Sequence, residues 1–226
     1  QAAIPELHIA LKQLSRRADV HNYLGLALFY SSHPDASFTE FREAIKREGN
    51  RIRYRHDLAS ALETTGHVKE AVEEYRRIVD IYPKNQEAIG WYARSLQFAG
   101  RNDDAIAQIK KGLDINSANS DLHNLYGTVL INKGQREAGI QEKLLAQHYS
   151  PNNPNYHFEL STWYFTFGRT SEAIQEARNA VDISPQYGLG WVNLGWYLIC
   201  AGKIDEAAAA CYKAVELLPK SSNAHA

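Results

Sequence analysis

The stretch that decides the fold is GLGWVNLGWYLICAGKIDEAAAACYKAVELLPKS, residues 188–221. Windows of the same length, taken back along the chain without a gap, share its pattern of large, small and turn-forming residues. A fixed period of 34 residues that recurs in this way is the signature of a repeat architecture. The chain therefore consists mainly of copies of one unit, and the five further windows start at Ala18, Ile52, Gln86, Ser120 and Pro154.

Three columns of the aligned windows carry matching residues. One column is large and apolar, the column three residues before it is small, and the column four residues after it is mostly glycine. Matching chemistry at fixed positions predicts that all six windows fold alike. The columns read Leu28, Leu62, Leu96, Leu130, Tyr164 and Leu198; then Gly25, Ala59, Ala93, Gly127, Ser161 and Gly195; then Ser32, Gly66, Gly100, Gly134, Gly168 and Gly202.

Each window is predicted to form two amphipathic helices, because its apolar residues recur every three or four positions. A glycine can adopt the left-handed conformation that ends the first helix, and the proline near the end of most windows stops the second. Small residues are expected where the paired helices cross. One pair alone cannot bury its apolar face, so neighbouring pairs should stack on one another.

Two windows depart from the common pattern. The first carries SSHPDA, residues 31–36, where a glycine turn is expected, which predicts a reshaped turn between its helices. The fourth carries Gly139 and Lys143 at positions that usually pack, which predicts a looser second helix.

The last window resembles the tetratricopeptide repeat, whose motif is W-x2-L-G-x2-Y followed by A-x3-F and a terminal proline. The resemblance covers residues 18–221. It implies an all-α, right-handed α-solenoid of about six helix-turn-helix repeats with a leading helix. The residues of the last window that carry the resemblance are Trp191, Leu194, Gly195, Leu198, Ala207, Cys211 and Pro219.

The ends of the chain fit the same register. Residues 1–17 are expected to form the second helix of a preceding partial repeat, and residues 222–226 the start of a further repeat or a tail. Solenoids need polar caps and no charged capping helix follows Pro219, so we expect an interior segment of a longer protein; a shortened form of a complete protein is the alternative. The six repeats are 18–51, 52–85, 86–119, 120–153, 154–187 and 188–221.

Composition excludes several classes of protein. The chain has 25 basic and 26 acidic residues, which argues against a dedicated nucleic-acid-binding protein with its usual basic excess. No apolar run approaches the about 18 residues of a membrane-spanning helix, so no membrane insertion of this segment is expected. Cys200 and Cys211 fit neither a disulfide framework nor a zinc site. None of these features identifies the compartment in which the protein works.

The nine histidines are the first candidates for a metal site. His21, His123, His157 and His225 share one column, but no two histidines have the i, i+4 spacing of a helical metal site. The column is expected to face a layer of packed helices. No nucleophile elbow, phosphate-binding glycine loop or strand pattern is present. The chain is therefore predicted not to be an enzyme and to hold no cofactor or metal.

A dense run of charges spans the junction of the first two windows. It reads FREAIKREGNRIRYRH, residues 41–56, with its basic cluster at 42–55. Two interpretations stay open for this cluster: a solvated junction between repeats, or a patch for an acidic partner.

In tetratricopeptide repeat proteins the first helix of each pair lines a concave groove that takes an extended peptide or a helix. Aromatic side chains interleaved with polar groups suit the recognition of a peptide. Alternatively, some of these aromatic residues pack only against the next helix. The resemblance implies that the groove is lined by Asn22, Tyr23, Tyr30, Arg53, Asp57, Trp91, Arg94, Phe98, Asn124, Thr128, Phe158, Glu159, Phe165, Asn193 and Trp196.

The resemblance does not extend to two specialised groups of the family. Asn22 and Leu26 stand where the members that clamp chaperones have lysine and asparagine, and Asn193 is alone in a column where others carry an asparagine ladder. The expected function is a non-catalytic scaffold for protein–protein interaction, with a protein or peptide partner. Two alternatives stay open: a regulatory or targeting arm of a larger enzyme of the glycosyltransferase or kinase type, and a scaffold that self-associates through uncapped solenoid ends.

Overall fold

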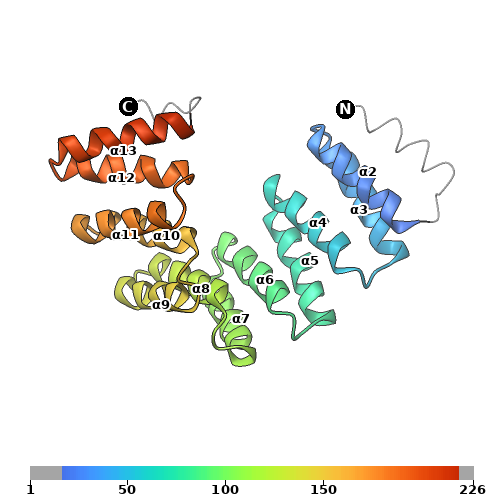
Figure 1. Ribbon diagram of the computed structural model, residues 1–226. Coiled ribbons are helices and arrows are strands. Elements are labelled where there is room, and N and C mark those ends of the chain that lie inside the picture. The colour runs from blue at the N-terminus through green and yellow to red at the C-terminus, as the bar shows by residue number, and fades with distance from the viewer. Residues whose placement is uncertain (1–16, 219–226) are drawn as a thin grey trace. The chain divides into compact units, whose positions relative to one another are not determined.

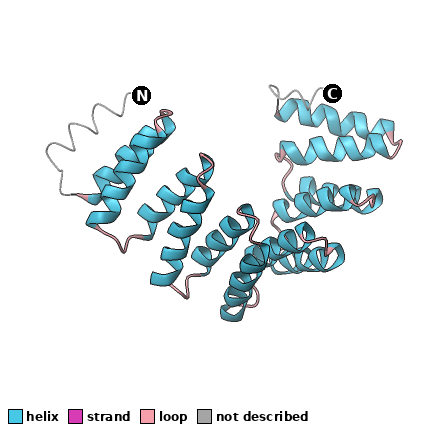
Figure 2. Ribbon diagram, turned by 180° about the vertical axis from the view of Figure 1, so that it is seen from behind, coloured by secondary structure: helices cyan, strands magenta, loops and turns pink. Residues whose placement is uncertain are grey.

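The computed structural model describes residues 17–218, and within them it contains twelve helices and no strand (Figure 1 and Figure 2). Consecutive helices form six antiparallel pairs, which confirms the predicted all-α solenoid of helix-turn-helix repeats. Apart from Arg17, the leading helix predicted from residues 1–17 lies outside the described residues. The same holds for the tail at 222–226, for Pro219 and for His225.

The chain divides into two compact units, Gln1–Ile115 (unit 1) and Asn116–Ala226 (unit 2). The described part of each unit contains three helix pairs. In unit 1 they are α2 (Ala18–Tyr30) with α3 (Pro34–Arg47), α4 (Ile52–Thr64) with α5 (Val68–Ile81), and α6 (Gln86–Phe98) with α7 (Asn102–Ile115). In unit 2 they are α8 (Ser120–Asn132) with α9 (Arg136–Tyr149), α10 (Pro154–Thr166) with α11 (Thr170–Ile183), and α12 (Gly188–Cys200) with α13 (Ile204–Leu217).

Three of the first helices start at an asparagine whose side chain caps the helix. Asn85, Asn119 and Asn153 accept hydrogen bonds from backbone N–H groups of the first turn at 2.9–3.1 Å. Such caps satisfy N–H groups that have no partner within the helix. The period of 34 residues thus places the helix starts of the three pairs at equivalent positions.

The turns within all six pairs have the same conformation. Their five glycines have φ between 72° and 84°, and Ser32, which replaces the glycine in the first pair, has φ 64°. The backbone N–H of His33 donates to Leu28 O at 2.9 Å, and that of His67 donates to Leu62 O at 2.8 Å. The prediction of a reshaped first turn was therefore wrong, because Ser32 takes the left-handed conformation that glycine takes elsewhere.

The small columns lie where the paired helices cross, as predicted. A Cβ atom added to Gly127 of α8 would lie 2.6 Å from the backbone oxygen of Gly139 in α9 and 2.6 Å from Cγ of Lys143. This close approach contradicts the looser helix predicted for the fourth repeat. Two facing glycines bring the backbones of α8 and α9 together, and the Lys143 side chain is buried between them.

Each unit has its own apolar core. In unit 1 the rings of Phe38 and Phe41 pack with Leu58 and Leu62, so that α3 is joined to α4. In unit 2 the core runs from Ile131 through the pairs that follow it to Ala210. The first helix of each pair also has a polar face, which lies beside these cores. Most residues of the candidate site lie on these polar faces.

Candidate functional site

The residues predicted to line a groove lie on the first helices and differ in exposure. Asn22 is buried, and its Nδ2 donates to Oδ2 of Asp57 on α4 at 2.7 Å. Tyr23, Tyr30, Arg53, Arg94, Phe98 and Trp196 are exposed; Asp57, Trp91, Asn124, Thr128, Phe158, Glu159, Phe165 and Asn193 are half-buried.

Three of the half-buried aromatic side chains pack against other rings. Trp91 lies 4.2 Å from the ring of His56, and Phe165 stacks on Tyr197 at 4.4 Å. Phe158 meets the ring of Tyr187 edge to face at 5.3 Å. Part of the surface of these three aromatic residues is therefore covered by neighbouring rings. This agrees with the interpretation that some of the aromatic residues pack against other helices.

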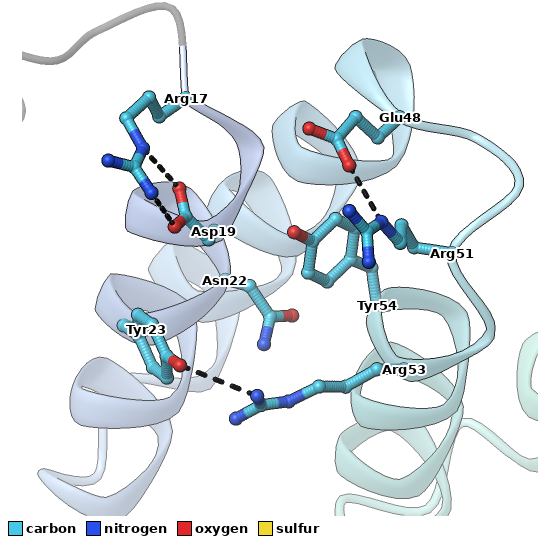
Figure 3. A pocket seen from close by; sticks show the side chains of 8 residues that line it. All are labelled: Arg17, Asp19, Asn22, Tyr23, Glu48, Arg51, Arg53 and Tyr54. Atoms are coloured by element: carbon cyan, nitrogen blue, oxygen red, sulfur yellow. Dashed lines mark hydrogen bonds and ion pairs between the residues drawn. The ribbon is translucent and has the colours of Figure 1, made fainter.

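Unit 1 has a pocket of about 370 Å³ between α2 and α4 (Figure 3). Two ion pairs stand at its rim, Arg17 with Asp19 at 2.6 Å and Arg51 with Glu48 at 2.9 Å. The hydrogen bond from Arg17 holds the pKa of the Asp19 carboxyl below its usual value. The lining residues are Arg17, Asp19, Asn22, Tyr23, Glu48, Arg51, Arg53 and Tyr54.

The orientation of Asp19 leaves this pocket open. In unit 2 the equivalent carboxylate, Asp121, accepts a hydrogen bond of 2.6 Å from the Tyr156 hydroxyl on the following first helix. In unit 1 Asp19 is bonded to Arg17 instead, and Tyr54 occupies the position of Tyr156 (Figure 3). The hydrogen bond from the tyrosine hydroxyl to this carboxylate is therefore present in unit 2, whereas unit 1 has the pocket at the same position.

Within the pocket, the guanidinium of Arg53 lies 5.0 Å from the centre of the Tyr23 ring and donates to the Tyr23 hydroxyl at 3.4 Å (Figure 3). Its Nε atom is 3.7 Å from Oδ2 of Asp57, which is longer than a hydrogen bond. Asp57 instead accepts a hydrogen bond of 2.7 Å from Nδ2 of Asn22.

The arginines of the basic cluster at 42–55 have acidic partners. Their ion pairs leave little unbalanced positive charge, which supports the interpretation as a solvated junction between repeats. The pairs are Arg42–Glu70, Arg47–Glu43, Arg51–Glu48, Arg53–Asp57 and Arg55–Glu74.

A buried lysine lies beneath the polar face of unit 2. Lys143 is 1% exposed, and its Nζ donates to Oδ1 of Asn124 at 2.8 Å, to Oγ1 of Thr128 at 2.9 Å and to Oε2 of Glu159 at 2.9 Å. Burial lowers the pKa of Lys143, while the charge and hydrogen bond of Glu159 act in the opposite direction. From the sequence alone, Lys143 was notable only because it stands at a repeat position whose residue usually packs in the core.

The histidine column has a structural role that the sequence interpretation did not identify. A carboxylate on the second helix, nineteen residues further on, binds His21, Arg55, His123 and His157 at 2.6–2.7 Å. A second nitrogen of Arg55, His123 and His157 also bonds a backbone carbonyl in the preceding loop, at 2.9–3.2 Å. We call this arrangement the loop clamp. Its carboxylates are Glu40, Glu74, Glu142 and Glu176.

The histidines that form loop clamps therefore have protein partners for their ring nitrogens. Within residues 17–218, no three histidine, cysteine, aspartate or glutamate side chains gather in a way that could hold a metal ion. No helix in this range is both long and apolar enough to cross a membrane.

Comparison with known families matches two tetratricopeptide repeat models to the chain, at residues 24–86 and 65–128. Among curated proteins nothing matches. Solved structures show the same fold at low sequence identity. TTC0263, a thermophilic TPR protein of Thermus thermophilus, is 20% identical with a TM-score of 0.66, over 80% of this chain and 99% of that one.

Two further structures agree. PilF of Pseudomonas aeruginosa is 17% identical with a TM-score of 0.65, over 92% of this chain and 95% of that one. YrrB, described as a TPR protein with an unusual peptide-binding site, is 18% identical with a TM-score of 0.54, over 82% and 95% of the two chains. With its period, its turns and two family models that match residues 24–86 and 65–128, the chain contains tetratricopeptide repeats.

Proposed function

We propose that this chain is a non-catalytic scaffold that binds a peptide or a helix of a partner protein along its first helices. Proteins of this repeat family generally mediate protein–protein interactions, and repeat arrays present extended surfaces for that purpose. The observation that carries the proposal is the exposure of aromatic side chains on first helices. Tyr23 is 46% exposed, Phe98 63% and Trp196 55%.

Aromatic side chains in these positions are suited to be anchors. Each buries a large apolar area on binding and loses few rotatable bonds, so that such residues dominate the energetics of many interfaces. Polar groups that fix the direction of a bound chain lie beside them, such as Arg94 one helical turn from Phe98 and Asn193 one turn from Trp196.

The test compares first-helix aromatics with an aromatic residue on a second helix. Partner proteins are captured from a cell extract with the whole chain, and the bound segment is made as a labelled peptide for fluorescence anisotropy. Trp196→Ala and Phe98→Ala are expected to raise the Kd about tenfold or more for a peptide that contacts them. Tyr212→Ala, which alters a 78% exposed side chain on α13, is the matched control.

Equal Kd values for all three variants and the wild type would exclude the proposal. Helicity is measured by circular dichroism for each variant, so that loss of binding is separated from loss of fold.

The two alternative functions give different results. Self-association through the ends of the array predicts a molar mass that grows with concentration in light scattering, whereas the proposed scaffold alone keeps the mass of one chain. A targeting arm of an enzyme predicts that catalytic activity is encoded in the same full-length gene product.

A further inference from the structure

Two residues of the predicted groove in unit 1, Asp57 and Trp91, have the same neighbour. His56 lies on α4 next to Asp57, and its ring centre is 4.2 Å from that of Trp91 on α6. The Nδ1 atom of His56 is 3.6 Å from Oδ1 of Asp57, which is longer than a hydrogen bond. His56 therefore lies against both an aromatic and an acidic residue of the surface on which the proposed function rests.

The contact between His56 and Trp91 stands at a position where two other repeats have a hydrogen bond. In those repeats an asparagine on one first helix donates to a carboxylate on the next, 35 residues further on, at 2.7 Å and 3.1 Å. Asparagine has no titratable group, whereas histidine ordinarily changes its charge between pH 5 and 8. Of these three connections, the one through His56 can thus be altered by a change of pH near neutrality. The hydrogen-bonded pairs are Asn22–Asp57 and Asn124–Glu159.

The other groups around His56 are of kinds that ordinarily titrate outside this range. They are carboxyl and guanidinium groups and one tyrosine. The ring of Tyr75 is 6.0 Å from that of His56, and burial raises the pKa of Tyr75, so its hydroxyl stays neutral up to pH 8. From α2 comes the uncharged amide of Asn22, which donates to Asp57. The titratable and charged groups of this set are Arg53, Asp57 and Glu63 on α4, Tyr75 on α5 and Arg94 on α6.

Protonation strengthens both contacts of His56. An imidazolium has N–H donors on both ring nitrogens, so that Nδ1 can donate to Asp57. A cation within about 6 Å of an indole ring is attracted by the π electrons, and the ring of His56 is 4.2 Å from that of Trp91. The charged ring is thus held between Asp57 and Trp91, whereas the neutral ring is bound to Trp91 by packing alone.

We infer that His56 makes the binding of a partner at unit 1 depend on pH, because the protonated ring stays on Trp91 and opposes binding there. Trp91 is half-buried, and His56 covers part of its indole. A partner group that packs on this part of Trp91 has to displace His56, and a charged ring then loses its attraction to Asp57 and to the indole. The Kd is expected to be about two- to fivefold higher near pH 5.5 than near pH 8. The inference rests on the proposed binding of a partner along the first helices.

The first experiment needs no partner. It follows the indole signals of Trp91 by NMR in the whole, ¹⁵N-labelled chain, with a neutral, soluble gadolinium chelate as the probe of exposure. The chelate enhances relaxation most where it can approach the indole. The enhancement at Trp91, taken relative to that at Trp196, is expected to be larger at pH 8 than at pH 5.5.

One variant and one control make this measurement specific. His56→Gln removes the titrating ring and is expected to abolish the difference between the two pH values at Trp91. His33→Gln removes an exposed histidine of the same unit and is expected to keep the difference. Circular dichroism confirms that both variants are folded. An enhancement at Trp91 that is equal at both pH values in the wild type, or that still differs in His56→Gln, overturns the inference.

The second experiment measures the Kd at pH 5.5 and pH 8 by fluorescence anisotropy. The probe is a captured peptide that loses affinity in Trp91→Leu, with any histidine replaced by glutamine and with a label that does not titrate in this range. A Kd that is higher at pH 5.5 in the wild type and in His33→Gln, but equal at both pH values in His56→Gln, supports the inference. Equal Kd values in the wild type, a lower Kd at pH 5.5, or a difference that persists in His56→Gln overturns it.

The same experiment separates failure of the inference from failure of the proposed function. If peptides bind but none loses affinity in Trp91→Leu, the inference fails and the proposed function stands. If no peptide binds to the chain at either pH, both fail, whatever the relaxation measurement gives.

Discussion

The Nδ1 atom of His157 lies 2.7 Å from Oε2 of Glu176, and both side chains are largely buried. Burial disfavours the charged form of His157, but Glu176 and the carbonyl of Pro151 outweigh it and raise the pKa of His157 above its ordinary value. Burial also disfavours the charge of Glu176, yet hydrogen bonds from His157 and Gln147 bring its pKa below the ordinary value. The loop clamp of the fifth repeat is therefore an ion pair at pH values between the ordinary pKa values of glutamate and histidine.

This ion pair makes the stability of unit 2 depend on pH. The raised pKa of His157 gives a contribution that is complete below the ordinary histidine pKa and is lost as the pH rises through the folded value. The lowered pKa of Glu176 gives a contribution that is lost as the pH falls through its folded value. The pair therefore stabilises most between the ordinary pKa values of glutamate and histidine.

His157→Gln is accordingly expected to lower the free energy of unfolding by about 2 kcal/mol near pH 5.5, and by less near pH 8.5. Urea denaturation followed by circular dichroism measures the difference. Arg55→Gln is the matched control, because the arginine of that loop clamp stays charged and its loss should be the same at both pH values. Equal losses for His157→Gln at both pH values would show that its charge contributes nothing.

Removing the Lys143 ammonium should destabilise unit 2. Lys143→Met keeps the length of the side chain but leaves Asn124 and the half-exposed Glu159 without their donor, at a loss of about 1 to 3 kcal/mol in the free energy of unfolding. The double variant with Glu159→Gln should recover part of that loss. Because the pKa of Lys143 is lowered in the folded chain, its charging opposes folding. Wild-type stability relative to Lys143→Met should rise as the pH is raised from the lowered value towards 10.5.

The first turn offers a stabilising substitution. Ser32 has φ 64°, where a side chain is unfavourable, so Ser32→Gly should raise the free energy of unfolding in urea by about 1 kcal/mol. The reciprocal change at the same position of the second repeat, Gly66→Ser, should lower it by a similar amount, since Gly66 has φ 84°. A gain from both substitutions would refute the conformational explanation.

The crossing of α8 and α9 should tolerate no added methyl group at Gly127. Gly127→Ala places a Cβ atom against the backbone oxygen of Gly139, and we expect a loss of about 2 kcal/mol in thermal or urea unfolding. Gly195→Ala is the comparison, because there the Cβ atom meets Sγ of Cys211, which can rotate away. Its loss should be clearly smaller, and the reverse order would contradict the packing described for α8 and α9.

Much of the fold could be predicted because it depends on short-range rules that recur. The left-handed turn at Gly66 and its equivalents is encoded by single residues, and it ends every first helix at a fixed distance from its start. The anomaly at Ser32 misled the prediction, because the backbone bonds of the turn outweigh the small strain of one side chain.

Less of the candidate site could be predicted, because its members meet across helices. Glu142 and Glu176 form a visible column, but nothing in the sequence says that the column faces the histidines until the crossing of the helices is known. Asn22 was expected to line a groove from its position in the repeat. Its burial and its hydrogen bond to Asp57 on α4 are properties of the assembled helices, which the sequence does not give.

The loop clamp also decides how repeats can be exchanged between chains. In the fourth and fifth repeats it fastens the preceding loop, through Ser117 O and Pro151 O, to the helix pair that follows. The loop therefore belongs structurally to the helix pair that follows it. The boundary between the two units agrees with this, because it lies after Ile115 and before Ser117. Recombined arrays or shortened fragments should accordingly be cut upstream of the loop, so that each transplanted pair brings the carbonyl that its own histidine holds.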